Sequence, residues 1–313
     1  MRRYLIGRVA QLAIVIAGAL LATFLALHLV ADPAVLGLPI GTPLEAVDAF
    51  RETHGFNDDF LTQLGRFFWN ALQGDFGDSL WLGGSAMGHV FERLPATLML
   101  TVPAVLGGGL LGVCLGAMSA RRQDSLFANG LNVLSYSVIS IAEFWFAIML
   151  VLLFAVNIAW LPTGGYNPKP QVLILPILVL SLRPFAQNFQ LTQATMSAEY
   201  GKPYILAARA KGLSEGQVAR RHVLRNVAVP VVTLLLFELG RVFVGTAIII
   251  EIVFAWPGIG RLAASALFRG DIFLVQAVVM VAATATALLN LLADLFYFAI
   301  DPRTRHLVKV ARQ

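Results

Sequence analysis

Apolar residues dominate six long segments of the chain, and polar residues gather between them. A helix needs roughly 20 apolar residues to cross a hydrocarbon core of about 30 Å. The segments that reach this length are residues 9–30, 97–118, 131–156, 172–196, 227–255 and 273–300. The first follows Arg2 and Arg3, but it is longer than the roughly 7–15 residues of a signal-peptide core, so we read it as a retained helix. The pattern predicts an all-α membrane protein with six transmembrane helices.

The composition agrees with lipid as the solvent for most of the surface. Of 313 residues, 58% are apolar and 13% are charged, and the mean hydropathy is +0.76. Soluble domains are about 45–50% apolar and about 25% charged. A soluble core of this size would need a charged shell that the chain does not have. The composition therefore excludes a soluble enzyme, a disordered chain and a fibrous protein.

The distribution of charge predicts the orientation in the membrane. The chain carries 23 Lys and Arg against 18 Asp and Glu, a net charge of +5. With the N-terminus inside, 15 basic residues fall in cytoplasmic segments and six in external ones, whereas nine of the 18 acidic residues lie in 31–96. Cytoplasmic loops of membrane proteins are enriched in Lys and Arg. Both termini are therefore expected in the cytoplasm, and the positive charge requires no nucleic-acid partner.

These segments divide the chain into four parts. They are the N-terminal tail with the first span (1–30), an external, periplasmic region (31–96), a five-span core that includes a cytoplasmic loop at 197–226 (97–300), and a cytoplasmic tail (301–313). In the external region, aromatic and aliphatic residues recur at helical spacing: Phe60, Leu64, Phe67, Phe68 and Leu72. This spacing predicts an amphipathic helix on the outer surface.

The strongest functional signal lies in the cytoplasmic loop, where residues 199–230 read EYGKPYILAARAKGLSEGQVARRHVLRNVAVP. The residues from Tyr204 to Lys211 are predicted to form a short helix, which Gly212 ends. Ser214 and Gln217 have the spacing of a capping box that begins a second helix. A helix, a sharp turn and a helix suit docking into a groove on a partner protein. The alternative is a basic loop that only contacts lipid headgroups.

This loop resembles the cytoplasmic coupling loop of ABC-transporter permeases, the membrane subunits of binding-protein-dependent importers. The resemblance is greatest to the dipeptide, oligopeptide and nickel branch, although Leu206 stands where the wider superfamily prefers Glu. Six further short motifs occur in the order of that family: Asp32-Pro33, Gly74-Asp75-Phe76-Gly77, Arg93-Leu94-Pro95-Ala96-Thr97, Trp160-Leu161-Pro162-Thr163-Gly164-Gly165, Val253-Phe254-Ala255-Trp256-Pro257-Gly258-Ile259-Gly260 and Asp301-Pro302-Arg303.

The resemblance implies a type I ABC importer permease fold in the bacterial inner membrane and transport by alternating access. It implies these partners: membrane lipid, a homologous second permease subunit, two ATP-binding cassette ATPase subunits and a periplasmic substrate-binding protein. No cofactor is expected on this chain, because ATP and Mg²⁺ belong to the ATPase subunits. Short peptides are the expected cargo, with nickel chelates, glutathione and oligosaccharides as alternatives. The residues expected to couple to the ATPases are Ala207, Ala208, Arg209, Ala210, Lys211 and Gly212.

Six ionisable residues lie within or at the edges of the spans: Glu143, Arg183, Glu238, Arg241, Glu251 and Asp294. Such residues are expensive in lipid and usually face a bundle interior or a water-filled path. Glu238 and Arg241 are three positions apart on one helix, which predicts a mutually neutralised pair. Glu143 and Arg183 are the candidates for the translocation path.

Departures from the family pattern also fall inside the membrane. A Pro usually precedes Phe144-Trp145 in this branch, where this chain has Glu143, and Gln190 and Gln193 occupy the region that usually holds a basic residue before the loop. These changes affect the expected substrate rather than the family. Glycines at every fourth position of the second span, Gly108, Gly112 and Gly116, predict close packing of two helices.

Sequence signatures of catalysis are missing. The chain has no G-x-x-x-x-G-K-[ST] phosphate loop, no G-x-S-x-G nucleophile elbow and no H-E-x-x-H metal motif. Its single cysteine, Cys114, excludes an internal disulfide. The chain is therefore expected to be a transport subunit and not an enzyme. The alternative function is a secondary transporter or channel that works alone, which would need an ion path but no docking loop.

Overall fold

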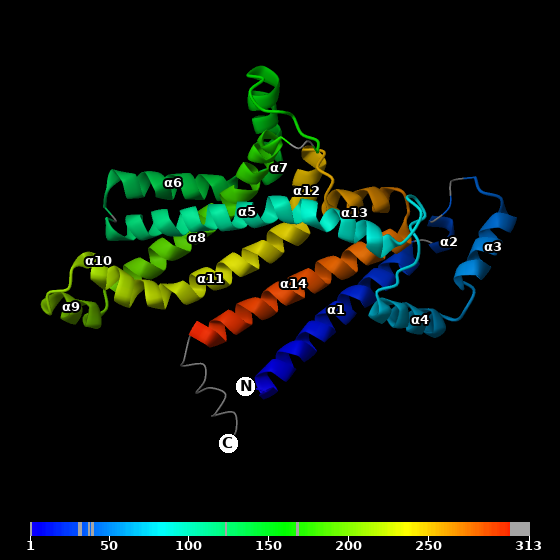
Figure 1. The fold of residues 1–313 in the computed structure, drawn as a ribbon, viewed down its shortest axis with the longest axis horizontal. Coiled ribbons are helices and arrows are strands. Elements are labelled where there is room, and N and C mark those ends of the chain that lie inside the picture. The colour runs from blue at the N-terminus through cyan, green and yellow to red at the C-terminus, as the bar shows by residue number, and fades with distance from the viewer. Residues whose placement is uncertain are drawn as a thin grey trace. The chain divides into compact units, whose positions relative to one another are not determined.

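The computed structural model describes residues 2–300 apart from 31–32, 37, 39–40, 123 and 167–168. Asp32 and the 301–313 tail, with its Asp301-Pro302-Arg303 motif, lie outside the described residues. Within the described part, the regular elements are helices, and an isolated bridge between Asp78 and Ser85 is the only β-type pairing (Figure 1). The all-α prediction is therefore confirmed.

The chain divides into two compact units, which we describe separately. The first consists of Met1–Leu98 and Ala255–Leu288, and the second of Met99–Phe254 and Leu289–Gln313. Two long helices, α5 (Ala86–Arg121) and α14 (Ile272–Ile300), contribute residues to both units.

The first unit holds the predicted amphipathic helix. Its complete helices are α1 (Arg2–Val30), α2 (Pro33–Leu36), α3 (Leu44–His54), α4 (Phe60–Gln73) and α13 (Ile259–Phe268). Helix α4 begins at Asp59, whose carboxylate accepts from the backbone N–H of Thr62 at 3.3 Å, and it ends at Gly74 with φ +74°. The ring of Phe67 lies 5.2 Å from that of Phe24 on α1, so the apolar side of α4 packs on the first span. The prediction of a helix at 60–72 is confirmed.

A buried carboxylate fixes the loop between α4 and α5 in the first unit. Asp271, which precedes α14, is completely buried. One of its oxygens accepts from the Ser79 hydroxyl at 2.5 Å and from the Trp81 backbone N–H at 3.1 Å. Its other oxygen accepts from the Leu274 backbone N–H at 3.1 Å and caps α14. A buried carboxylate of this kind is stabilised because both of its oxygens accept hydrogen bonds, three in all.

Two motifs that lie about 160 positions apart in the sequence meet at the start of α5. The hydroxyl of Thr97 accepts from the backbone N–H of Ile259 at 2.8 Å, which caps α13. The indole N–H of Trp256 donates to the Ala96 carbonyl at 2.9 Å, and the Trp256 side chain is almost completely buried. The motif at 93–97 and the part of the later motif at 255–260 are therefore joined by hydrogen bonds within the first unit.

The second unit is a bundle built around α8 (Ile174–Tyr200). Its other elements are α6 (Leu126–Ser140), α7 (Glu143–Leu150) with the π-helical η1 (Val151–Asn157), the 3₁₀ turn η2 (Pro170–Leu173), α9 (Pro203–Ala210), α10 (Glu215–Val218), the π-helical η3 (Ala219–Val223), α11 (Leu224–Arg241), the π-helical η4 (Val242–Thr246) and α12 (Ala247–Val253). Helices α6 and α11 both pack against α8, and the α9–α10 turn lies at one end of α8 and α11 (Figure 1).

Five helices are long and apolar enough to cross a membrane: Ile6–Ala26, Ala86–Arg121, Pro170–Tyr200, Asn226–Val253 and Ile272–Phe296. They correspond to five of the six predicted spans, although α5 begins 11 residues before the predicted start at 97. The prediction of one continuous span at 131–156 was wrong. Leu126–Ser140 and Glu143–Asn157 form a pair bent by 101°. The bend arises because Ile141 and Ala142 adopt extended backbone, which interrupts the helical hydrogen bonds.

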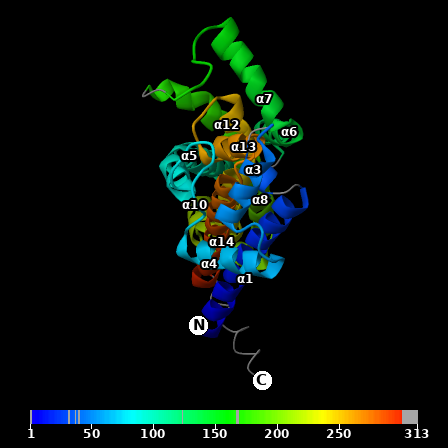
Figure 2. The same ribbon diagram turned by 90° about the vertical axis from the view of Figure 1, so that its right-hand side faces the viewer.

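Helix α7 therefore turns away from the end of α6, and Figure 2 shows the same departure from the side. By length and composition, the described residues therefore contain five continuous spans, or six if the bent pair is counted as one broken span.

Close packing of α5 on α8 follows the glycine pattern. A Cβ atom placed on Gly108 would lie 2.3 Å from the Ser181 carbonyl oxygen, and one on Gly112 would lie 2.2 Å from that of Phe185. A Cβ atom on Gly116 would lie 2.6 Å from the carbonyl oxygen of Phe189. Real Cβ atoms cannot approach backbone this closely, so only glycine permits this separation of the two helices. The prediction from the four-residue spacing is confirmed.

Candidate functional site

The loop at residues 197–226 folds as its local sequence predicts. Helix α9 begins with Pro203 at its first position and ends before Gly212, whose φ is +80°. The Gly212 N–H donates to the Arg209 carbonyl at 2.9 Å. A Cβ at Gly212 would meet no atom within 4 Å. The need for glycine at this turn is therefore conformational, since L residues with side chains are disfavoured at positive φ.

The second helix of the loop begins with the predicted capping box. The Ser214 hydroxyl accepts from the Gln217 N–H at 3.4 Å, and the Gln217 side chain accepts from the Ser214 N–H at 3.0 Å. Helix α10 then continues through η3 into α11 without a break, so the docking helix and the fifth span form one rod. The predicted helix–turn–helix is confirmed, with the addition that its second helix continues directly into α11.

An ion pair closes the turn between α9 and α10. The Arg209 guanidinium donates from Nε to Glu215 Oε1 at 2.7 Å and from Nη2 to Glu215 Oε2 at 3.1 Å. This bidentate hydrogen bonding lowers the pKa of Glu215 and raises the pKa of Arg209. Arg209 is therefore engaged within the loop, while the rest of its side chain is exposed.

The six predicted coupling residues do not share one environment. Ala207, Arg209, Ala210, Lys211 and Gly212 are exposed. Ala208 is buried with residues from both ends of the loop and from the adjoining helices: Ala120, Met196, Ile205, Val218, Val223, Val227 and Val231. Five of the residues can thus meet a partner, whereas Ala208 holds α9 against the bundle.

A buried carboxylate that the sequence did not predict ties the loop to its flanking helices. Glu199, near the end of α8, accepts from Asn226 Nδ2 on α11 at 2.7 Å and from the Tyr204 hydroxyl on α9, and it is paired with Lys202. Only 6% of Glu199 is exposed. Burial and the hydrogen bond to Glu199 raise the pKa of Tyr204. The available signal was the i, i+3 spacing of Glu199 and Lys202, but the contact with Asn226 spans 27 positions.

Four of the six ionisable residues in the spans form one cluster at the bend between α6 and α7: Glu143, Arg183, Glu238 and Arg241. Arg241 donates to Glu238 through Nε at 3.1–3.2 Å and through Nη2 at 2.8 Å, which confirms the predicted pair. The Glu143 carboxylate lies 3.9 Å from Arg183 and 3.9 Å from Arg241. Glu143 and Arg183, the two candidates for the translocation path, are therefore neighbours. The Glu238–Arg241 pair, which the sequence predicted to be self-contained, belongs to the same cluster. Glu251, by contrast, is completely buried in α12.

Two cavities line the α6–α8 side of the second unit. One, of about 220 Å³, is bounded by Glu143, Arg183 and apolar residues of α6, α7 and α8. The other, of about 300 Å³, is lined by polar side chains and one alanine: Asn132, Tyr136, Gln190, Gln193, Ala194 and Ser197. Gln193 donates to the Ser119 hydroxyl at 2.8 Å and Gln190 to the Ser135 hydroxyl at 3.2 Å. The two glutamines that depart from the family pattern thus lie on the wall of a polar cavity.

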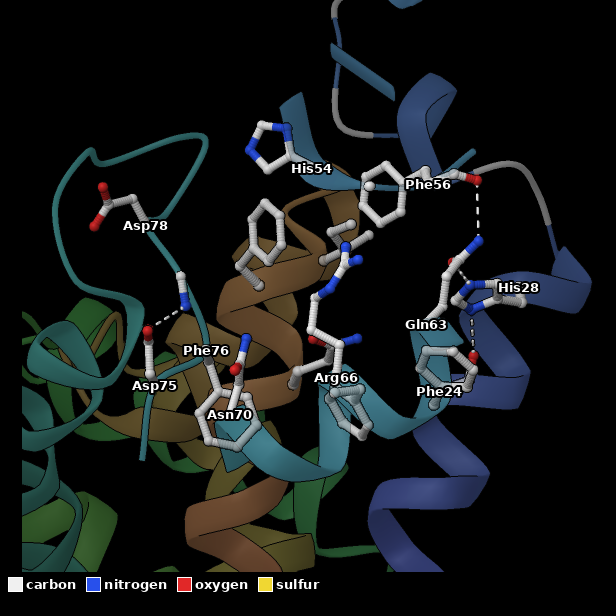
Figure 3. Close-up of a pocket in the computed structure, with 16 residues that line it drawn as sticks. Phe24, His28, His54, Phe56, Gln63, Arg66, Asn70, Asp75, Phe76 and Asp78 are labelled. Carbon is white, nitrogen blue, oxygen red and sulfur yellow. Dashed lines mark hydrogen bonds between the residues drawn. The ribbon is translucent and has the colours of Figure 1, made fainter. Parts of the chain in front are cut away.

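A third cavity, of about 290 Å³, lies in the first unit between α1, the α3–α4 loop, α4 and α14, and the sequence did not predict it (Figure 3). Gln63 spans one side of it. Its amide nitrogen donates to the Phe56 and Asp58 carbonyls at 3.0 and 2.8 Å, and its oxygen lies 3.0 Å from His28 Nε2. Arg66 extends into the cavity and is paired with Asp58. Among the described residues, no three His, Cys, Asp or Glu side chains are grouped to hold a metal ion.

Comparison with known proteins identifies relatives along nearly the whole chain. Residues 112–306 match the family described as binding-protein-dependent transport system inner membrane component. A putative peptide transport system permease protein of Brucella abortus is 33% identical, over 98% of this chain and 100% of the relative. The oligopeptide transport system permease protein AppB of Bacillus subtilis is 32% identical, over 83% of this chain and 85% of the relative.

One solved structure gives the same architecture. A chain of the MetNI methionine ABC transporter, in an inward-facing conformation, is 20% identical and aligns with a TM-score of 0.51. The alignment covers 70% of this chain and 96% of that chain. At this level of identity the likeness concerns the fold, which is that of a type I importer permease.

Proposed function

Because this chain belongs to the family of inner membrane components of binding-protein-dependent transport systems, it is a permease subunit of an ABC importer, and we propose that its cargo is a short peptide. The observation that carries the cargo is the 33% identity, over 98% of the chain, to a relative named as a peptide transport permease. ATP hydrolysis in this family belongs to separate subunits. The chain's own contribution is the path for the cargo and the link between that path and the ATPases.

The partners proposed for this chain are a homologous second permease, two ATPase subunits and a periplasmic substrate-binding protein. ATP and Mg²⁺ bind to the ATPases. The exposed part of the α9–α10 turn, with Ala207, Ala210 and Lys211, enters a groove on one ATPase. Small side chains suit this contact because they allow the partner's backbone to come close.

Movement of the loop is transmitted to the spans because three elements are joined at Glu199. Its carboxylate accepts hydrogen bonds from Tyr204 on α9 and Asn226 on α11, while its backbone belongs to α8. Closure of the ATPase dimer would therefore shift α8 and α11 together with the loop. This shift opens the translocation path between the spans toward the outside. ATP hydrolysis then returns the path to the state that opens toward the cytoplasm.

The proposed path runs along the polar side of α8. Arg183, Gln187, Gln190, Ala194 and Ser197 recur at intervals of three or four positions, so they share one helix face over about 21 Å. Glu143 adds a carboxylate beside Arg183. Amide and hydroxyl groups can exchange hydrogen bonds with a peptide backbone, and the charged cluster offers partners for its termini.

The test is peptide uptake by proteoliposomes that contain the complete transporter. With the binding protein outside and ATP and Mg²⁺ inside, radiolabelled alanyl-leucine should accumulate against its gradient. Omission of the ATPase subunits should abolish accumulation. Uptake by this chain without any ATPase would instead support a secondary transporter or channel. ATP-dependent uptake of a nickel chelate or an oligosaccharide, with none of the peptide, would retain the importer and reject the peptide cargo.

A further inference from the structure

The charged cluster at the α6–α7 bend is not fully satisfied. Arg241 is engaged by Glu238 and also donates to the Thr246 hydroxyl at 3.2 Å. Glu143 and Arg183, at 3.9 Å, are too far apart for a hydrogen bond. Glu143 Oε1 and Arg183 Nε are both buried and have no hydrogen-bond partner among the described residues. Charged groups without hydrogen bonds are costly to bury and are uncommon in native proteins, so these two atoms indicate a missing ligand.

A cavity adjoins the same two side chains. Its volume is about 220 Å³, and six of its nine lining residues are apolar: Leu134, Val138, Ile141, Phe146, Val179 and Leu182. Sites for drug-sized ligands usually measure about 300–1,000 Å³. The cavity is therefore the right size for one amino-acid residue of a longer molecule. Its chemistry is that of an apolar side chain with a charged group beside it.

We propose, on the basis of the peptide-import function above, that this cavity binds the C-terminal residue of the peptide in transit. Its carboxylate binds Arg183 and its apolar side chain lies against the α6, α7 and α8 walls. The planar guanidinium matches a carboxylate with two parallel hydrogen bonds, which accounts for the unpartnered Nε.

The distribution of charge favours a carboxylate over the peptide ammonium. The cluster holds two guanidinium groups, Arg183 and Arg241, and two carboxylates, Glu143 and Glu238, and Glu143 also lies in the first turn of α7, where the helix N-terminus adds partial positive charge. Arg183 has a single carboxylate nearby and shares it with Arg241. When the peptide carboxylate takes Arg183, Glu143 keeps Arg241 as its partner. An arriving ammonium would instead compete with both guanidinium groups and the α7 N-terminus for Glu143, because Glu143 is the one carboxylate of the cluster that lines the cavity.

The experiment measures ligand protection of a thiol in the cavity. The transporter, assembled without the binding protein, carries Cys114→Ser and Ser137→Cys in this chain, and the rate of alkylation at position 137 is followed by mass spectrometry. Ser137 lines the cavity and is not charged. The probes are alanyl-leucine and its C-terminal amide. Protection by the free acid should require about tenfold less ligand than protection by the amide, the loss expected for one charged hydrogen-bonded contact. Equal protection by both probes overturns the proposal, and this comparison needs no change at Arg183.

Two variants separate ligand binding from a structural ion pair. Arg183→Gln should remove the preference for the free acid. Glu143→Gln should increase that preference, because Arg183 then has no competing carboxylate. A purely structural pair predicts that both variants weaken protection to a similar extent, and that result would reject the proposal. Uptake of alanyl-leucine by the complete transporter serves as the separate check: absence of ATP-dependent uptake rejects the peptide cargo, whereas normal uptake with equal protection rejects only the C-terminal subsite.

Discussion

At the scale of single residues, the loop depends on two positions that act for different reasons. Gly212 adopts a backbone conformation with φ +80°, and a Cβ atom at this position would have no atom within 4 Å. Glu199 supplies a buried carboxylate that joins α8, α9 and α11. The first residue controls the shape of the turn and the second controls its attachment to the membrane helices.

Replacement of Gly212 by alanine should cost about 1–2 kcal/mol in the turn, because a Cβ is disfavoured in the left-handed region. We expect the ATPase activity stimulated by peptide and binding protein to fall severalfold in the reconstituted transporter. Gly216→Ala is the matched control, since Gly216 also has open space around it but lies in the helical conformation of α10. Equal coupled activity in the two variants would contradict a conformational role for Gly212.

Replacement of Glu199 by glutamine should loosen the loop, because each hydrogen bond to a charged group contributes about 1.5–3 kcal/mol and glutamine keeps only a neutral acceptor. The expected readout is faster protease cleavage within 201–226, with the subunits still assembled. Tyr204→Phe removes one of the donors and should have a smaller effect in the same direction. Asp48→Asn, which alters an exposed ion pair with Arg51, should leave cleavage unchanged. Unchanged cleavage in Glu199→Gln would argue against the clamp.

At the scale of elements, two features shape the second unit: the close packing of α5 on α8, and the break between α6 and α7. Helices α5 and α8 approach so closely that glycine is required at Gly108 and Gly112. Helices α6 and α7 separate at Ile141 and Ala142, which places Glu143 at the first turn of α7. An acidic residue is favourable there because the N-terminus of a helix carries partial positive charge. The break thus positions the carboxylate beside Arg183.

Gly112→Ala tests the tight contact. The new Cβ would lie 2.2 Å from the Phe185 carbonyl oxygen, so the helices must separate, at a cost of about 1–3 kcal/mol for overpacking. The melting temperature of the purified transporter should fall. Gly107→Ala on the same helix meets no atom within 4 Å and should leave the melting temperature unchanged or slightly raise it. A Gly112 variant as stable as the Gly107 variant would show that α5 and α8 are not in backbone contact.

At the scale of the whole molecule, charge assigns each connection to a side of the membrane. Fifteen basic residues fall in the segments proposed to be cytoplasmic, six of them in the 197–226 loop. The loop that carries the proposed coupling residues is therefore also the segment that the positive-inside rule assigns to the cytoplasm most strongly. The proposed orientation and the proposed coupling therefore depend on the same stretch of sequence.

Thiol labelling of intact cells tests the proposed orientation. In a chain with Cys114→Ser, a membrane-impermeant maleimide should label Trp160→Cys, which follows the broken span, and should not label Lys211→Cys in the loop. Both original side chains are exposed, so each introduced thiol is accessible once its side of the membrane is reached. Permeabilised cells serve as the control, in which both positions should react. Labelling of Lys211→Cys in intact cells would reverse the topology.

The sequence by itself determined the membrane class, five of the six spans, the helix at 60–72 and the turn of the coupling loop. Each of these depends on apolar length or on hydrogen bonds between residues a few positions apart. The Ser214–Gln217 capping box is such a case, because both of its hydrogen bonds join residues three positions apart. Spacing along the chain is sufficient to predict contacts of this kind.

Tertiary structure alone decided the break after Ser140, the burial of Ala208, the Glu199 clamp and the meeting of Glu143, Arg183 and Arg241. Most of these contacts join residues 27 to 98 positions apart. Their partners depend on the rotation of each helix about its axis. When a span is apolar on every side, its sequence has no periodic pattern of polar and apolar residues from which that rotation could be predicted. Packing sets it instead, as the glycine face of α5 does against α8, and only the packed bundle brings the charges together.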